Sequence, residues 1–364
     1  MYICEKQNTM IAQKYKKTGN RGLFDEQDNY QKLSAIGNPL EKISLVIDFE
    51  AFRSTLEKGI LNKEKRNNAG AKPFDVVLMF KILILQRFYG LGDTQIEYQI
   101  LDRLSFKKFL GLESGDKVPD EKTVWAFREA LTTKGLVEEL FNQFRDYLEG
   151  KGLIMNEGKM IDASFTVAPR QRNTREENKM IKEGKGDELW NDKPNKKRHK
   201  DIDARWTKKN NETFYGYKNH AKVDTRGKFI DKYKVTDASV HDSQPLDDLL
   251  TDKDKGQNIH ADSAYTGEDQ EKVVSKYQMN NCIHEKGYRN KPLTEEQKNS
   301  NKEKSKTRAR VEHVFGFMEQ SMNGLALKSV GIARATGIIG LINLTYNLFR
   351  YEQVLRLNII QINN

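Results

Sequence analysis

Cysteine is scarce in this chain, and long apolar runs are missing. The two cysteines, Cys4 and Cys282, are far apart and belong to no CxxC or mixed Cys/His pattern. The sequence therefore needs no oxidising compartment and predicts no structural zinc site. The longest apolar runs, Val76–Leu85 (which contains Lys81) and Gly337–Leu344, are too short to span a bilayer. No N-terminal stretch has the apolar centre of a signal peptide. We expect a cytoplasmic protein with no membrane segment.

Positive charge is in excess. The 364 residues include 62 Lys and Arg against 52 Asp and Glu, which gives a net charge of +10 and a pI of about 9.2. A chain of this length has room for two or three domains. The excess favours a polyanionic partner, with nucleic acid as the default. A basic protein without such a partner fits the charge equally well.

Residues 1–150 divide by pattern into two parts. Residues 1–72 are polar and weakly patterned, and we interpret the first thirty or so as a poorly ordered arm or a small oligomerisation element. Residues 73–150 show short helical periods separated by Gly and Pro turns, which resembles helix-turn-helix packing. Arg128 lies on the polar side of one predicted helix and is a candidate DNA contact. A plain helical bundle is the alternative.

The stretch Gly158–Val167 alternates in polarity, which predicts a strand. Met160, Asp162, Ser164 and Thr166 share its more polar face. Asp162 then stands in mid-strand, where a carboxylate is costly unless it is paired, hydrogen-bonded or bound to a metal.

A long polar stretch, residues 168–212, follows this strand. It has 14 Lys and Arg against 9 Asp and Glu, includes the basic run Lys196–Lys200, and shows no apolar period. An insertion of this length is usually functional or disordered. Basic residues interleaved with Trp190 and Trp206 suit a nucleic-acid strand, with Trp206 as a platform for a base. A solvated loop is the alternative.

The next segments predict a hairpin and further strands. Phe214–Val223 and Lys228–Thr236 pair across a turn, and Lys218, His220 and Lys222 share one face of the first strand. These three are candidate phosphate contacts, although a solvated strand face explains them nearly as well. The pattern beyond predicts short strands at 257–262 and 279–284, a loop at 299–306, a helix from Thr307, a Gly/Ala-rich connector at 324–340 and a final apolar helix.

Three acidic residues fall at places that can converge: Asp162 in the first strand, Asp262 at the end of a later strand, and Glu312 on the helix after Thr307. Three carboxylates without His or Cys favour hard cations such as Mg²⁺ or Mn²⁺. Two such ions would serve an in-line phosphoryl displacement. Spacing alone is weak support, because 52 acidic residues offer many triples. A strand-edge salt bridge for Asp162, a helix cap for Asp262 and an ion pair of Glu312 with Arg308 are the structural alternatives.

Four motifs in order resemble the bacterial insertion-sequence transposases of the DDE class, specifically the insertion-sequence-five group. They begin at Lys159, Tyr215, Ala261 and Arg308 and read KMIDAS, YGYKNH, ADSAYTG and RARVEH. Residues 73–131 are similar to the helical N-terminal domain of the same group.

The resemblance implies an α/β fold: an RNase H-like mixed β-sheet flanked by helices and preceded by an all-α N-terminal domain. The implied units are an arm at 1–72, a helical DNA-binding domain at 73–150, a catalytic domain at 151–350 and a tail at 351–364. Asp162, Asp262 and Glu312 would be the catalytic residues and the ligands of two Mg²⁺ or Mn²⁺ ions. Arg308 matches the arginine of the family helix motif; Ser305 and Glu319 replace its tyrosine and lysine, with Arg310 and Lys306 as candidate substitutes.

The implied activity is cleavage at the terminal inverted repeats of the element and joining of the 3′ ends to target DNA. The implied partners are double-stranded DNA, as element ends and target, and further copies of the chain in a dimer or higher synaptic complex at the bacterial nucleoid. A transposase-derived protein that binds DNA without cutting it, and an RNase H-like nuclease without strand transfer, are the alternatives.

Overall fold

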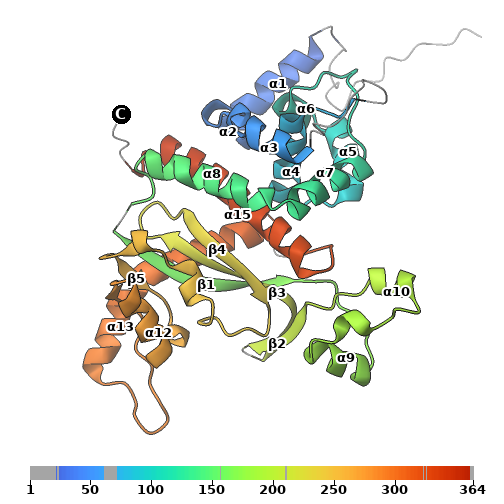
Figure 1. Cartoon of the computed structure of the whole chain (residues 1–364). Helices are drawn as coiled ribbons and strands as arrows, with labels where there is room; N and C mark the ends of the chain where they lie inside the picture. Colours follow the sequence, from blue (N-terminus) through green and yellow to red (C-terminus); the bar gives the residue numbers. More distant parts are fainter. Residues whose placement is uncertain are drawn as a thin grey trace, which may run out of the picture.

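The computed structural model of the protein describes residues 22, 24–60, 72–155, 157–209, 211–322, 324 and 326–360. A helical region comes first in the chain and lies above a mixed sheet, which carries helices on both faces (Figure 1). This arrangement confirms the predicted fold class. Residues 1–21, 23 and 61–71, which include Cys4 and parts of the predicted arm at 1–72, lie outside the described residues.

Local capping explains where several helices of the N-terminal region begin. The Asp75 carboxylate accepts hydrogen bonds from the amides of Val77 and Leu78, and the Asp120 carboxylate accepts one from Thr123. The helices are α1 (Asp25–Ile36), α2 (Pro39–Val46), α3 (Arg53–Ile60), α4 (Val76–Phe88), α5 (Asp93–Asp102), α6 (Leu104–Leu110), α7 (Glu121–Thr133) and α8 (Leu136–Gly150).

The segment that precedes α4 is part of the core, unlike the weakly patterned arm that we expect for residues 1–72. Leu40, Ile43 and Leu56 are fully buried, and Phe52 packs on Phe80 of α4 at 5.1 Å between ring centroids. Each of these helices is short and contributes only a few apolar residues, so no single window shows a strong period. The predicted boundary between residues 72 and 73 therefore falls inside one hydrophobic cluster.

The sheet has the order β2–β3–β1–β5–β6, and β4 pairs with β3 on the same edge as β2. β1 is antiparallel to β3 and parallel to β5, which makes the sheet mixed. The predicted hairpin beside the Asp162 strand is present as β3 and β4. The strands are β1 (Gly158–Val167), β2 (Arg205–Lys209), β3 (Glu212–Asp224), β4 (Ile230–Asp237), β5 (Asn258–His260) and β6 (Asn280–Asn281).

Gly216 marks the point where β3 changes partner from β2 to β4. Its φ is +149°, and a Cβ at this position would overlap the Thr166 carbonyl oxygen and lie 2.7 Å from the Ala168 amide. Only glycine allows β1 and β3 to approach so closely here.

Both faces of the sheet are covered. Met160 of β1 belongs to the large hydrophobic cluster shared with the N-terminal region and α15, whereas Ile161 belongs to a second cluster formed with α11 and α12. The covering helices are α11 (Leu246–Leu249), α12 (Glu268–Lys276), α13 (Glu295–Arg308), α14 (Arg310–Gly316) and α15 (Ile332–Arg356).

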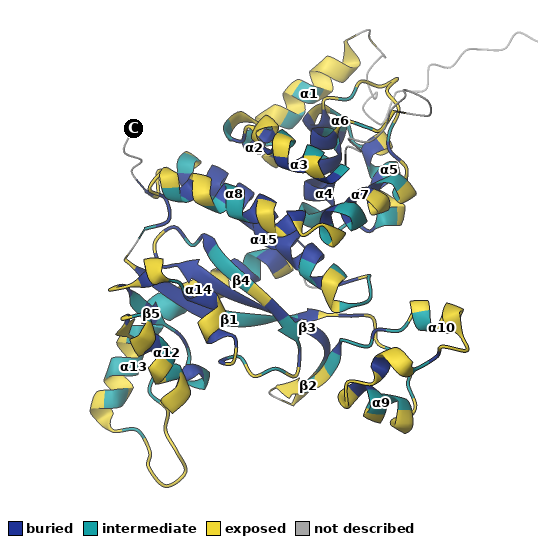
Figure 2. Ribbon diagram, viewed as in Figure 1, coloured by how far each residue is buried: buried dark blue, intermediate teal, exposed yellow. Residues whose placement is uncertain are grey.

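Helix α15 joins the two halves of the molecule, because it contacts α4, α7 and α8 on one side and β4 on the other (Figures 1 and 2). Its Phe349 stacks on Phe88 at 3.6 Å between ring centroids. The predicted connector at 324–340 is wrong beyond Gly331, because Gly337 and Gly340 belong to this helix. A Cβ on Gly340 would overlap the Tyr233 hydroxyl, so the small residue serves close packing. Across the described ranges, no helix has the length and apolarity that crossing a membrane would need.

Two polar segments are ordered where we expect loops. Residues 299–306 lie within α13, whose residues are all at least partly exposed, so no apolar stripe reveals it. The basic insertion contains α9 (Arg175–Lys182), α10 (Pro194–Arg198) and the sheet strand β2. Polar contacts hold it together: Trp190 Nε1 donates to Glu177 at 2.6 Å, and Lys196 Nζ lies 2.8 Å from the same oxygen.

Candidate active site

The site begins where β5 stops pairing with β1. Their parallel pairing covers Gly158–Met160 of β1, and β5 ends at His260. Asp162 lies two residues further along β1 and Asp262 two residues beyond the end of β5. Because adjacent parallel strands advance together, both carboxylates reach the same edge of the sheet. The sequence predicts that Asp162, Asp262 and Glu312 converge, and their role as one catalytic site stays a prediction.

Asp162 is an acid in a poorly solvated place. Its side chain is 18% exposed, and its Oδ1 accepts the amide of Ala163 at 2.8 Å. Burial raises its pKa to about 6, the Ala163 amide opposes the shift, and the negative charge of Asp262 adds to it. Asp262 caps the short turn that follows and accepts the amide of Ala264 at 2.8 Å. Asp162 and Asp262 are thus two neighbouring carboxylates, which are a suitable donor pair for a cation.

Arg308 occupies the position between the first and third acids. Its Nη1 lies 3.6 Å from Asp162 Oδ2, and its Nη2 lies 2.6 Å from Glu312 Oε1. Glu312 is 59% exposed and held on the guanidinium rather than on the two aspartates. Within the part of the chain that the structure describes, no three His, Cys, Asp or Glu side chains are arranged to hold a metal ion. The donor types thus fit a hard cation, and Glu312, the third predicted ligand, is paired with Arg308.

Tyr265 and Asp242 are neighbours of the site that sequence reasoning does not single out. The Tyr265 hydroxyl is buried without a hydrogen-bond partner. Burial, followed by the charges of Asp162, Asp242 and Asp262, raises its pKa far above the ordinary value. Asp242 is paired with Lys218 at 2.7 Å. The signal for Tyr265 is its place in the ADSAYTG motif, three residues after Asp262.

The helix that carries Arg308 shows what replaces the family motif. The Ser305 hydroxyl donates to the Asn301 carbonyl at 2.7 Å and lies 3.3 Å from His284 Nε2. Lys306 pairs with Glu303, and Arg310 donates to the Thr225 carbonyl at 3.2 Å. Glu319 is exposed. Neither candidate substitute is directed at the carboxylates by these contacts, and their DNA roles stay predictions.

The strand residues that we predict as phosphate contacts are buried. Lys218 is bound by Asp242, His220 Nε2 lies 2.8 Å from Thr236 Oγ1, and Lys222 Nζ lies 2.7 Å from Asp254. Their strand, β3, lies between β1 and β4 and contacts α11, so the face that we predict as phosphate-contacting or solvated is internal. In this arrangement the charges of Lys218 and Lys222 are compensated within the protein.

The other two predicted contacts differ from each other. Trp206 on β2 is 45% exposed; its ring lies 4.8 Å from the Tyr215 ring between centroids, and the Arg170 guanidinium lies over it at 5.9 Å. Arg128 is buried and forms two bonds to Asp93, at 2.5 and 2.7 Å. DNA contact by either residue stays a prediction.

Comparison with protein families assigns both halves of the chain. Residues 158–348, from the first residue of β1 into α15, match the model of the transposase DDE domain. The chain belongs to the DDE transposase family. Residues 28–130 of this DDE transposase match a second model, Transposase domain (DUF772), which covers α2 to α6 and most of α1 and α7. The match confirms the resemblance at the level of the family; the insertion-sequence-five group stays a prediction.

A solved structure with a similar chain is described as a piggyBac transposase synaptic complex with hairpin DNA, determined by cryo-electron microscopy. The identity is 12%, the TM-score is 0.41, and the alignment covers 92% of this DDE transposase and 79% of that chain.

Proposed function

We propose that this DDE transposase binds the terminal inverted repeats of its insertion sequence, cleaves the DNA strand at each end by hydrolysis and joins the freed 3′ ends to target DNA. The observation that carries the proposal is the meeting of Asp162 and Asp262 at one sheet edge, with Arg308 and Glu312 beside them. The site is made of oxygen donors, with one guanidinium for phosphate charge.

Asp162, Asp262 and Glu312 would hold the divalent ions, Mg²⁺ or Mn²⁺. Such ions, when bound, activate the attacking hydroxyl and stabilise the charge on the leaving oxygen. For Glu312 to join the two aspartates it has to leave Arg308, to which it is bound at 2.6 Å. The released guanidinium then lies beside the reacting phosphate, which it binds through charge-assisted hydrogen bonds.

The test is cleavage of a duplex that carries the inverted repeat and its flanking DNA. Asp162→Ala, Asp262→Ala and Glu312→Ala should each reduce nicking in Mg²⁺ by at least about a hundredfold. Binding of the same duplex in EDTA should stay within a few fold of wild type. Asp269→Ala is the matched control, because it removes an exposed carboxylate on α12.

Normal nicking by all three variants would refute the assignment of the carboxylates. Products with a new joint between the element end and target DNA would distinguish a transposase from a nuclease without strand transfer.

DNA binding without cleavage is the second candidate function. The observation that favours it is the ion pair between Arg308 and the exposed Glu312, which keeps the third carboxylate away from the other two. Tight binding of the inverted repeat with no metal-dependent nicking, in Mg²⁺ or Mn²⁺, would support this candidate over the first.

The proposed activity also sets the expected partners. Two element ends have to be held together, so we propose a dimer or higher synaptic complex on double-stranded DNA at the bacterial nucleoid. Light scattering of the protein with and without paired ends tests this assembly.

A further inference from the structure

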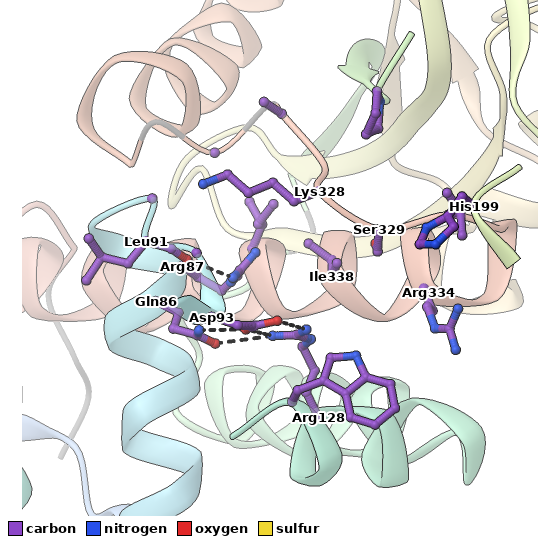
Figure 3. A pocket seen from close by; sticks show the side chains of 18 of the residues that line it. Gln86, Arg87, Leu91, Asp93, Arg128, His199, Lys328, Ser329, Arg334 and Ile338 are labelled. Carbon is purple, nitrogen blue, oxygen red and sulfur yellow. Dashed lines mark hydrogen bonds and ion pairs between the residues drawn. The ribbon is translucent and has the colours of Figure 1, made fainter. Parts of the chain in front are cut away.

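A basic pocket lies where the N-terminal helices, α15 and the insertion meet (Figure 3). Its volume is about 480 Å³. Arg87 comes from α4 and Trp125 from α7, Arg198 comes from α10, and Lys328 precedes α15. Segments from the N-terminal helices, the insertion and the chain around the start of α15 therefore line one cavity.

The lining has more positive charge than the protein compensates. Arg128 is neutralised by Asp93 and Arg334 by Glu129, each through two or more close contacts. Arg87, Arg198 and Lys328 have no ion pair within the described residues. Lys328 projects over the first turn of α5, because its Nζ would lie 2.9 Å from a Cβ built on Gly92. Three cationic groups thus face a cavity whose one acidic lining residue is already paired.

Hydrogen-bond donors in the pocket are also unused. Arg87 Nε and Ser329 Oγ are buried and have no partner, and the one hydrogen bond of the Arg87 guanidinium is a 3.4 Å contact to the Leu91 carbonyl. Burial, together with the charge of Arg128, lowers the pKa of Arg87 to about 10. A half-buried cation with a buried, unpartnered donor is costly, and an anion in the pocket would relieve that cost.

The position of the pocket relates it to the carboxylates. Its residue Pro169 follows the end of β1, seven residues after Asp162. At about 3.3 Å per residue of extended chain, Pro169 lies within roughly 23 Å of Asp162.

The size of the pocket limits what can enter it. A sphere of 480 Å³ is about 10 Å across, whereas a duplex is wider than its own major groove, which measures roughly 12 Å. A duplex therefore cannot enter, although a backbone phosphate can. Trp125, 45% exposed at the rim, offers an apolar surface for the neighbouring sugar or base.

We propose that this pocket holds a backbone phosphate of the bound DNA, away from the cleaved bond. The inference rests on the proposed function, since it takes DNA as the substrate. Arg87 binds the phosphate from the N-terminal region, Lys328 from the segment before α15, and Arg198 from the insertion. The insertion and the N-terminal region thereby bind the same DNA phosphate.

The experiment measures binding of a fluorescein-labelled duplex containing the inverted repeat, by anisotropy in EDTA, from 50 to 200 mM salt. Lys328→Ala and Arg198→Ala remove exposed side chains and should leave the fold intact. Each should lower the salt slope by about one unit, so the affinity loss at 50 mM exceeds that at 200 mM by about 3.5-fold. Lys272→Ala is the matched control, because Lys272 is an exposed lysine of α12 that does not line the pocket, and this variant should bind the duplex as wild type does.

A second measurement identifies the source of the phosphate. The fluorescence of wild type minus that of Trp125→Phe should respond to the duplex at its binding concentration, and to inorganic phosphate or a deoxynucleoside monophosphate only at far higher concentrations. Saturation by either small molecule at the duplex concentration would overturn the DNA assignment. Unchanged affinity and slope in both pocket variants, with tight wild-type binding, would overturn the pocket alone. A wild-type protein that does not bind the duplex would overturn the proposed function as well.

Discussion

Removal of the Arg128 charge tests whether this residue supports the fold or contacts DNA. Arg128 of α7 makes a two-bond pair with Asp93 at the start of α5, and its Nη1 also lies 3.4 Å from Gln86 of α4. The Arg128 side chain is 9% exposed and the Asp93 side chain 28%. Arg128→Met keeps the aliphatic stem and leaves Asp93 buried without its closest cation.

The size of the effect follows from this burial. Breaking a buried pair by removing one partner costs about 3–5 kcal/mol, because the other charge stays uncompensated. Asp93 keeps some contact with water, so we expect a loss of about 3 kcal/mol, at the lower end of that range. With an m-value of about 3 kcal/mol/M, the urea midpoint should fall by about 1 M.

The assay is urea unfolding followed by circular dichroism, paired with DNA anisotropy in the absence of urea. The double variant Arg128→Met/Asp93→Asn should recover part of the loss, because no charge is left unpaired. Lys122→Met, an exposed lysine of the same helix, should unfold as wild type. An unchanged urea midpoint in Arg128→Met, together with weaker DNA binding and a smaller salt slope, would show that Arg128 serves DNA and that this reasoning is wrong.

Two further predictions concern stability. Gly216→Ala should lower the free energy of unfolding by about 3 kcal/mol or more, because the added Cβ overlaps the Thr166 carbonyl at a φ of +149°. Gly115→Ala, whose added Cβ lies in open space, is the control and should change it by less than about 0.5 kcal/mol. Equal melting temperatures of the two variants would contradict this prediction. Burial raises the pKa of Asp224 to about 6, above its unfolded value, so the stability that this group contributes is present below about pH 4 and lost as pH rises through 6. The free-energy difference between wild type and Asp224→Asn should therefore shrink by about 2 kcal/mol from pH 4.5 to 7, and a difference that is constant or grows over this range would count against the assignment.

The elements that the sequence predicts well are those with a local signal. The alternation of β1 predicts a strand with Asp162 inside it, and the apolar stripe of Val311, Val314 and Phe315 predicts a buried helix. The proximity of Asp162 and Asp262 came from family motifs rather than from spacing. Their placement on one sheet edge depends on the parallel pairing of β1 with β5, which no local pattern records.

The wrong predictions of exposure and of loops share one physical cause: a polar sequence does not by itself say whether a residue is buried or whether a segment is helical. Lys218 and Lys222 are polar in sequence but internal, because Asp242 and Asp254 arrive from distant segments to compensate them. Conversely, α13 has no buried residue and so gives no hydrophobic period, yet it forms a helix with a capping box at Thr294. The role of Arg308 between Asp162 and Glu312 is a three-body contact, and only the i, i+4 half of it is visible in the sequence.

The placement of α15 has a consequence for synthesis. This helix completes the packing of α4 and α8, yet it is translated some 268 residues after α4 ends (356 − 88). At about 5–20 residues per second, the apolar faces of the N-terminal helices wait roughly 15–50 s for their partner. During that interval the nascent chain exposes Phe88 and its neighbours to chaperones or to other chains. Premature termination before α15 would thus leave an aggregation-prone fragment rather than a free DNA-binding domain.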